Sequence, residues 1–229
     1  MNDTLYQAAA LIVPLIFAIV FHEVAHGWVA RALGDPTAER MKRLSLNPLR
    51  HVDPIGTLVL PGFLALVKAP VFGWAKPVPV NKWMLRNPRT GMMMVAIAGP
   101  ASNLILAGIA ALLLGVMARQ IGGLPPAGSL AHFLVLNLLN FISINVFLAL
   151  FNLLPIPPFD GSHVVEGLLP RSWAAVFERM RPFGFPVVLL LLIVLPSLIP
   201  GFDPVGKLVV PPVDWLTGHY LGFADRLAG

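Results

Sequence analysis

Three long apolar stretches, almost free of charge, constrain the fold more than any other feature of the sequence. They cover residues 5–32, where the first charge is Glu23, residues 90–118 and residues 130–154. A transmembrane helix needs about 20 apolar residues, so each stretch is long enough to cross a bilayer. Only 12% of the residues are charged and 57% are hydrophobic, whereas soluble chains carry about 25% charge. A chain of 229 residues has too little interior to hide so much apolar surface from water, and we therefore expect an integral membrane protein.

Two further apolar stretches lie toward the C-terminus. Residues 182–202 are interrupted by three internal prolines, and residues 205–223 contain Lys207, Asp214 and His219. The last stretch forms either a final span or a helix that lies in the membrane interface. The fold class that we expect is an all-α polytopic membrane protein with about five or six transmembrane helices.

A short re-entrant or β-like element is expected between the first two clear spans. Residues 55–67 are apolar, but 13 residues are too few for a helical crossing, and prolines and glycines in this region break helices. Residues 71–80, VFGWAKPVPV, alternate Pro and Gly with residues that favour strands. Irregular backbone at membrane depth is tolerated where protein or a wet cavity satisfies its polar groups.

The distribution of Lys and Arg predicts the orientation in the membrane. Residues 31–50 and 68–89 each hold five basic residues, residues 159–182 hold three, and the turn at 119–129 holds one. Cytoplasmic loops carry the excess of basic residues, so we expect the N-terminus and this turn outside and the other loops in the cytoplasm. The short element then enters and leaves on one side, in agreement with its length. The net charge of +5 faces anionic headgroups in this orientation, and we expect no nucleic acid partner.

A metal-binding pattern lies near the inner end of the first span, at His22-Glu23-Val24-Ala25-His26. Two histidines four residues apart share one helix face, so both imidazoles can reach one metal ion, and the Glu can take a proton from a water held there. The same pattern also occurs by chance in soluble helices, as surface histidines and a solvated Glu. Inside an apolar span ionisable residues are costly and indicate function, which favours the metal site.

A third metal ligand has to be a carboxylate or a histidine, because the chain contains no Cys. Asp160 directly follows the third apolar stretch, in the segment NLLPIPPFDG. Three prolines there prevent a regular helix, and the predicted orientation places Asp160 on the same side of the membrane as His22 and His26. Asp160 is alternatively a loop acid that caps the next helix, and His163 is a rival ligand.

Three segments resemble the site-2 proteases, a family of intramembrane zinc metalloproteases: HEVAH in an apolar helix, AGPASN opening a later span, and NLLPIPPFDG after another. The stretches NPLRHVDPIGT and FGWAKPVPVN are similar to the compact bacterial and archaeal branch. The resemblance covers about residues 5–167 and implies one zinc ion per chain, with His22, His26 and Asp160 as ligands and Glu23 as the catalytic base. It also implies cleavage of a substrate's transmembrane segment within a prokaryotic inner membrane. The 229 residues leave no room for the PDZ or nucleotide-sensing domain of larger members.

Three further polar residues have two interpretations each. Asn103 lies within the second span and Asn152 near the end of the third. Each amide either joins helices by hydrogen bonds or, as the resemblance suggests, donates to the substrate carbonyl or oxyanion. His51, beside Asp53, is either an interfacial histidine or a support of the site from the loop before the short element.

The sequence therefore predicts a single membrane-embedded protease domain over residues 1–229, with a catalytic core at about 5–167 and C-terminal apolar segments at 182–224. Its partners are the lipid bilayer and a membrane protein with a transmembrane helix. We expect this substrate to reach the site along the Gly- and Pro-rich residues 55–80, where an edge strand pairs with the unwound segment. An ion- or proton-coupled transporter is the alternative, because transporters also place His and Glu inside helices, but it would not require Asp160 at a matching depth. A protease-like protein that only binds membrane helices would lack a catalytic residue, and none is missing here.

Overall fold

The computed structural model describes residues 3–59, 63, 66 and 75–229. Every regular element in this part of the chain is a helix, which confirms the predicted all-α class. The chain divides into two compact units. Unit 1 is Met1–Ala18, Pro100–Leu153 and Pro204–Gly229, and unit 2 is Ile19–Gly99 and Leu154–Asp203.

Two long helices run through both units. They are α1 (Asp3–Ala32) and α4 (Pro88–Ile121), and each contains one internal proline. Both carry the apolar stretches predicted as spans, and each extends slightly beyond the charge-free run. Arg31 closes α1 and Arg119 closes α4, where a basic side chain favours the negative end of the helix dipole.

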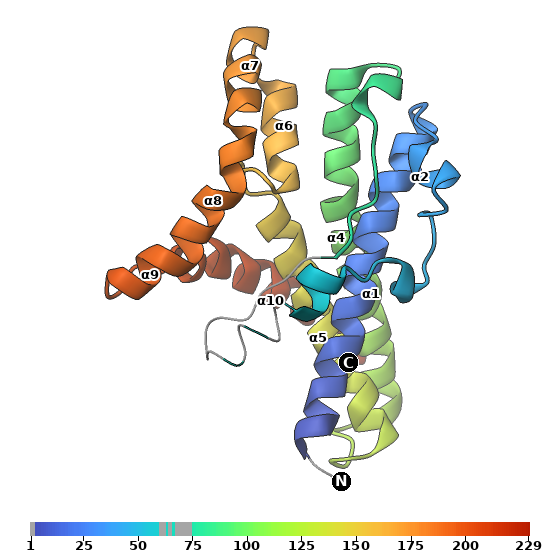
Figure 1. The fold of residues 1–229 in the computed structure, drawn as a ribbon. Coiled ribbons are helices and arrows are strands. Elements are labelled where there is room, and N and C mark those ends of the chain that lie inside the picture. The colour runs from blue at the N-terminus through green and yellow to red at the C-terminus, as the bar shows by residue number, and fades with distance from the viewer. Residues whose placement is uncertain (1–2, 60–62, 64–65, 67–74) are drawn as a thin grey trace. The chain divides into compact units, whose positions relative to one another are not determined.

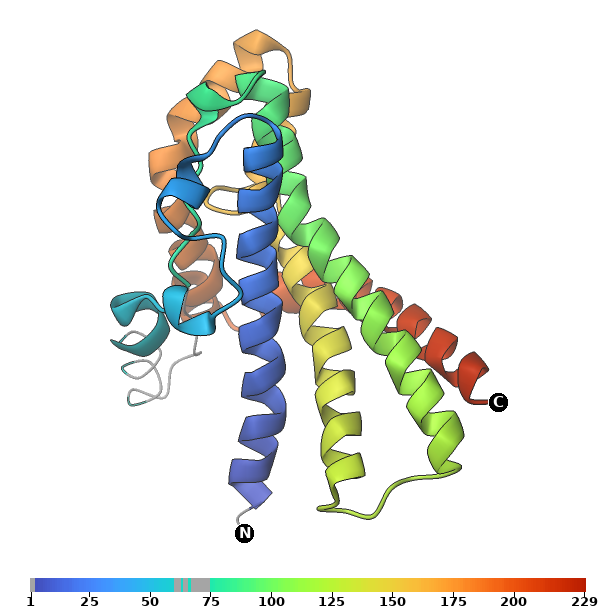
Figure 2. The same cartoon turned by 90° about the vertical axis from the view of Figure 1, so that its right-hand side faces the viewer.

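Unit 1 adds α5 (Leu130–Asn152) and α10 (Val210–Ala228) to its parts of α1 and α4. Figure 2 shows the turn at 122–129 that joins α4 to α5. The Ser129 hydroxyl starts α5 by accepting a hydrogen bond from the backbone N–H of His132 (3.1 Å). α10 packs against α5.

Two polar side chains inside unit 1 bond to backbone carbonyls of neighbouring helices. Asn140 donates to the carbonyl of Ala10 (2.8 Å), and the Tyr220 hydroxyl donates to the carbonyl of Leu104 (2.9 Å). An apolar surrounding makes an unpaired polar group costly, so these contacts join the helices.

Unit 2 contains the second part of α1, the first part of α4 and the helices that follow residue 154. These are α6 (Asp160–Leu168), α7 (Arg171–Met180), α8 (Gly184–Leu189) and α9 (Leu195–Leu198). Figure 1 shows α6 and α7 side by side, and the two helices are in contact. The short α2 (Thr37–Arg40) follows α1.

The fourth predicted span begins earlier than the sequence indicated. A single helical segment runs over Arg171–Leu198, eleven residues upstream of the predicted start at 182. Pro182 lies in the first turn of the 3-10 helix η4 (Arg181–Phe183), where a proline costs no internal hydrogen bond. Pro196 follows a π-helical turn, η5 (Leu190–Val194), and such turns accommodate a break in the regular hydrogen-bond pattern.

Four helices in the described part of the chain are long and apolar enough to cross a membrane. At most 33% of the apolar window in any of them is buried inside the protein, so lipid can cover the rest. They are Leu5–Ala32, Pro88–Ile121, Leu130–Asn152 and Arg171–Leu198. The predicted membrane protein is thus confirmed, and a number of spans beyond these four stays a prediction, as does the role of α10.

The predicted re-entrant or β-like element lies partly outside the described residues, which omit 60–62, 64–65 and 67–74. Its start forms a π-helical turn, η2 (Pro54–Val59), and residues 75–81 have no assigned helix or strand. The Lys76 N–H donates to the carbonyl of His51 (2.8 Å). The β-like form of this element therefore remains a prediction.

Candidate metal centre

His22 and His26 lie one turn apart on α1, as their spacing predicts, and their rings turn toward one point. Both residues are buried, at 7% and 8% exposure, and their Nε2 atoms are 3.1 Å apart. The Nδ1 of His26 is 2.7 Å from the carbonyl oxygen of Val95 on α4. A carbonyl only accepts hydrogen bonds, so Nδ1 carries the proton and the Nε2 of His26 presents a lone pair. This is the arrangement of a metal-binding histidine that is fixed by a backbone acceptor.

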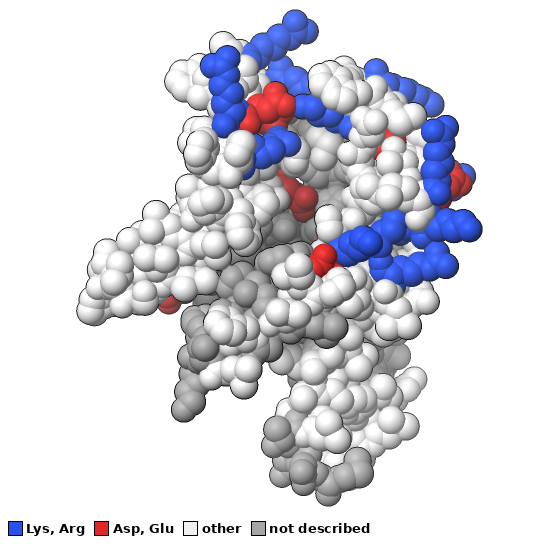
Figure 3. Space-filling model, viewed as in Figure 1, with Lys and Arg blue, Asp and Glu red and all other residues white. Residues whose placement is uncertain are grey.

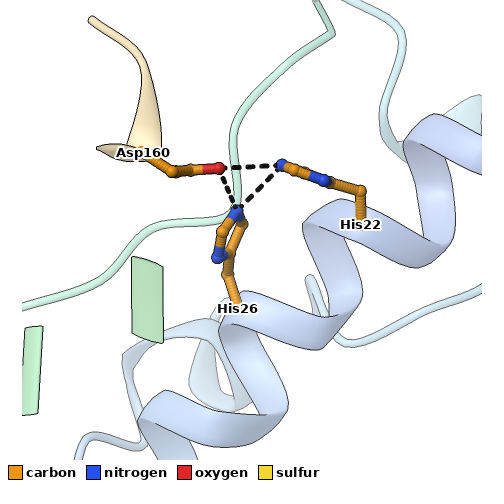
Figure 4. Close-up of side chains that lie close together, drawn as sticks. All are labelled: His22, His26 and Asp160. Carbon is orange, nitrogen blue, oxygen red and sulfur yellow. Dashed lines mark hydrogen bonds and ion pairs between the residues drawn. The ribbon is translucent and has the colours of Figure 1, made fainter. Parts of the chain in front are cut away.

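Asp160 joins the two histidines from the first turn of α6. Its Oδ2 is 3.1 Å from the Nε2 of His22 and 3.3 Å from the Nε2 of His26 (Figure 4). The segment between α5 and α6 holds the prolines that interrupt the helix, and α6 begins at Asp160 itself. Burial opposes the charge of Asp160, but the two neighbouring imidazoles outweigh it and lower the pKa of this carboxyl below its ordinary value.

The three donor atoms fit a zinc ion. Ligands about 2.0–2.1 Å from a tetrahedral zinc are about 3.3–3.4 Å apart, and the three atoms here are separated by 3.1–3.3 Å. Two imidazole nitrogens and one carboxylate oxygen form a donor set typical of catalytic zinc, with a fourth position left for water or substrate. Among the described residues, His22, His26 and Asp160 are the group of three that meets the distances of a metal site.

Glu23 contacts a different element from its neighbouring histidines. Its Oε2 accepts a hydrogen bond from the backbone N–H of Val78 (2.8 Å), in the segment 75–81, which has no assigned helix or strand. Val78 is 7% exposed. A carboxylate that accepts a buried backbone N–H is held in one orientation.

The segment 75–81 is fixed on both sides of Val78. The Arg43 guanidinium, 8% exposed, donates to the carbonyls of Lys76 (2.7 Å) and Pro77 (3.4 Å). The fully buried Asp35 accepts a hydrogen bond from the N–H of Asn81 (2.6 Å). Arg43 and Asp35 therefore position the N–H that holds Glu23.

His51 contacts the segment 75–81 that carries Val78. His51 is 3% exposed, and its ring Nε2 donates to the carbonyl of Ser45 (2.7 Å). Its own carbonyl accepts the Lys76 N–H. His51 thus braces the segment that carries Val78, and a role in the reaction stays a prediction.

The two asparagines bond to helices in unit 1. The Asn103 amide, fully buried, donates to the carbonyl of Ala18 (3.3 Å) and to the Oδ1 of Asn145 (2.7 Å). Asn152 donates to the carbonyl of Leu148 one turn earlier (2.9 Å). The contacts of Asn103 agree with the interpretation that its amide joins helices. For Asn103 and Asn152, a donor role toward the substrate stays a prediction.

His163, the rival third ligand, faces other partners. Arg181 donates to its Nδ1 (3.2 Å), and the carboxylate of Glu166 is 3.9 Å from the same atom. Burial and the Arg181 charge lower the pKa of His163 from 6.5 to about 4. The His163 side chain therefore contacts Arg181 and Glu166, and the group of three that meets the distances of a metal site contains Asp160 instead.

Gly99 is a site residue that the sequence analysis did not single out. A Cβ at this position would lie 2.5 Å from the Cε1 and Nε2 of His26 and 2.6 Å from the Cε1 of His22. Glycine therefore lets α4 approach the two imidazoles. A glycine before a proline inside an apolar span was the available signal, but it also fits a simple helix kink.

Gly99→Ala is expected to weaken zinc binding at least about tenfold, because the new methyl group displaces both imidazoles from their positions. Gly108→Ala on the same helix is the matched control, since its Cβ would lie 3.5 Å from the nearest atom of Tyr220, an ordinary contact. Zinc per chain after dialysis against a zinc buffer measures the effect. Wild-type affinity in Gly99→Ala would show that the ligands do not depend on this close approach.

Comparison with known proteins assigns the family. Residues 10–195 match the family model described as Peptidase family M50. A protein of Bacillus subtilis (strain 168), "Putative zinc metalloprotease YwhC", is 38% identical over 203 residues, which are 89% of this chain and 84% of that protein. "Putative zinc metalloprotease MJ0611" of Methanocaldococcus jannaschii is 32% identical over 69% of each chain.

"Putative zinc metalloprotease Rip2" of Mycolicibacterium smegmatis is 29% identical over 78% of this chain and 64% of its own length. No solved structure matches the chain. The family match covers most of the chain and includes the histidine pair and Asp160. The chain belongs to peptidase family M50, the site-2 protease family, and is a zinc metalloprotease of the membrane.

Proposed function

We propose that this protein is an intramembrane endopeptidase that cleaves the transmembrane segments of membrane proteins at one zinc ion held by His22, His26 and Asp160. The convergence of these three donors within 3.3 Å, two of them on a helix long and apolar enough to cross a bilayer, is the observation that carries the proposal. Zinc, when bound, acts as a Lewis acid on the scissile carbonyl and makes water a nucleophile at neutral pH. Residues 1–229 are proposed as one protease domain, with the core at 5–167, because α1 and α4 each run through both units.

Glu23 acts as the general base in this proposal. It takes a proton from the attacking water and then gives it to the leaving amine. The hydrogen bond from the Val78 N–H keeps the carboxylate in one orientation before reaction. Asn103 and Asn152 remain proposed donors to the oxyanion.

Substrate access along residues 55–80 is also part of the proposal. A helical substrate hides its peptide bonds in its own hydrogen bonds, so it has to unwind before cleavage. The segment 75–81 has no assigned helix or strand, and its contact with the proposed base Glu23 through Val78 supports this path. Residues 60–62, 64–65 and 67–74 of the proposed path lie outside the described part.

Cleavage within the bilayer can be tested with single-span membrane proteins tagged at both ends and reconstituted with the full chain in liposomes. We expect product termini, mapped by mass spectrometry, inside the apolar span, and we expect a zinc chelator to stop the reaction. Replacing helix-breaking residues of the substrate span by Leu should slow cleavage, because unwinding becomes harder. Product termini confined to the water-exposed flanks would contradict intramembrane cleavage.

The active site is proposed to face the cytoplasm of a prokaryotic cell, with the N-terminus outside. Figure 3 shows Lys and Arg side chains gathered over elements of unit 2, whereas unit 1 holds Arg119, Lys207 and Arg226. The metal ligands belong to the basic unit. Basic residues favour the cytoplasmic side, which supports this orientation.

Cysteine labelling tests the orientation cleanly, because the chain has no native Cys. Lys42→Cys and Arg86→Cys are expected to react with a membrane-impermeant maleimide only when the cytoplasmic face is open, and Gly123→Cys only from outside. Gly123 has open space at its Cβ, so this substitution disturbs no neighbour. Labelling of positions 42 and 86 from opposite faces would mean that the short element crosses the membrane.

A further inference from the structure

Unit 2 contains a cavity whose wall includes charged side chains but none of the metal ligands. Its volume is about 270 Å³, and it lies among the start of α4, the helices α6 and α7, and the 3-10 helices η3 (Lys82–Met84) and η4. Its wall carries six charged residues: Lys82, Arg89, Arg171, Arg181, Glu166 and Glu178. None of them has a role in the proposed proteolysis.

The charges of this cavity do not balance. Glu178 pairs with Lys82, and Glu166 pairs with Arg181. Arg89 and Arg171 have no carboxylate within ion-pair distance among the residues that the structure describes. The wall therefore holds two positive charges beyond the carboxylates that could neutralise them.

The histidine in the wall adds no charge near neutral pH. His163 accepts a hydrogen bond from Arg181, and its pKa is lowered to about 4 by burial and by that guanidinium. The surplus therefore belongs to arginines, whose planar guanidinium groups bind phosphate oxygens in pairs.

The surroundings of the cavity place it at the membrane surface. Trp83, in its wall, is 76% exposed, and Trp173, on α7, is 64% exposed. Exposed tryptophans of membrane proteins gather at the headgroup level. Met92, Ala174 and Ala175 give the wall an apolar side. Basic pockets between transmembrane helices bind the headgroups of anionic lipids.

We propose that this cavity binds a phosphate-bearing anion through Arg89 and Arg171, with the headgroup of an anionic phospholipid as its source in the membrane. The phosphate neutralises the surplus charge, and the apolar side of the wall faces the start of the lipid chains. The site differs from the metal centre in its residues and does not depend on the proposed proteolysis.

The binding test uses the purified full chain in detergent micelles doped with phosphatidylglycerol, with phosphatidylcholine as the neutral-headgroup arm and inorganic phosphate as the free-anion arm. Lipid retained per chain is counted by native mass spectrometry over a titration. We expect preferential retention of phosphatidylglycerol, and weaker retention as the salt concentration rises. The double variant Arg89→Gln with Arg171→Gln should bind at least about tenfold more weakly, since each basic residue near the surface contributes about fivefold.

Arg179→Gln is the matched control, because Arg179 lies on α7 but outside the cavity wall. It should leave lipid binding within about twofold of wild type. The pair Arg89→Lys with Arg171→Lys keeps both charges but loses the paired guanidinium contacts, so it should bind less tightly than wild type and more tightly than the Gln pair. If the Gln pair does not fold, the single variants Arg89→Gln and Arg171→Gln decide the matter, each with an expected loss of about fivefold. Competition by inorganic phosphate at equal affinity, lost in the Gln pair, would support the phosphate site and assign it to the free anion. Equal retention of the two lipids, or wild-type affinity in the Gln pair, would overturn the proposal.

Discussion

Glu23→Gln is expected to lower the rate of peptide cleavage by about 10²–10⁴, the usual contribution of a general acid–base group. Gln keeps the size of the side chain and an oxygen that accepts the Val78 N–H, but it cannot take a proton at neutral pH. His22, His26 and Asp160 remain in place, so zinc content and thermal stability should stay close to wild type. The turnover number with a reconstituted membrane substrate and zinc per chain are measured on the same preparation.

The control for this change is Glu39→Gln on α2, which removes the same charge from an exposed ion pair with Arg31. It should cleave at nearly the wild-type rate, since an exposed pair contributes little. An uncut substrate that copurifies with Glu23→Gln would support a trapped complex. Cleavage by Glu23→Gln at the wild-type rate would refute the proposed base even if zinc were present.

The spans were predictable where composition alone determines them. The charge-free runs at 90–118 and 130–154 became α4 and α5 with ends shifted by at most three residues, because apolar residues in lipid must satisfy their backbone within a helix. The start of the fourth helix was not predictable in this way. Residues Arg171–Met180 are helical but carry charged side chains, so this part of the helix lies outside the apolar run that was used to predict the span.

The part of the metal centre that depends on local sequence was predictable. The spacing of His22 and His26 is local, and helical periodicity alone places them on one face. Asp160 is 138 residues from His22, and only its chemistry, its position after a span and the family resemblance indicated it. The contact of Glu23 with Val78 and the approach of Gly99 depend on how distant segments pack, which no local pattern encodes.

Asp160→Ala is expected to lower zinc affinity by at least about 10²-fold, because one of three protein ligands disappears. This effect should exceed that of losing a residue that only hydrogen-bonds to a ligand. Asp160→Asn removes the negative charge with little change in shape, and it should also weaken zinc binding strongly. His163→Ala is the matched comparison on the same helix. Its ring contacts Arg181 and Glu166, so one zinc ion per chain should remain.

Zinc is measured by elemental analysis of the detergent-purified chain at fixed free zinc, with a chelator series to obtain relative affinities. The comparison tests the ligand assignment separately from the general base, since neither substitution alters Glu23. Circular dichroism establishes that each variant is folded, so that loss of metal reports on the site and not on the helices. Full zinc in Asp160→Ala together with loss of zinc in His163→Ala would make His163 the third ligand. In that case α6 would have to rotate by about 60° and shift by about 4.5 Å along its axis, because residues three apart in a helix are about 300° and three rises of about 1.5 Å apart. The two side chains now face different partners.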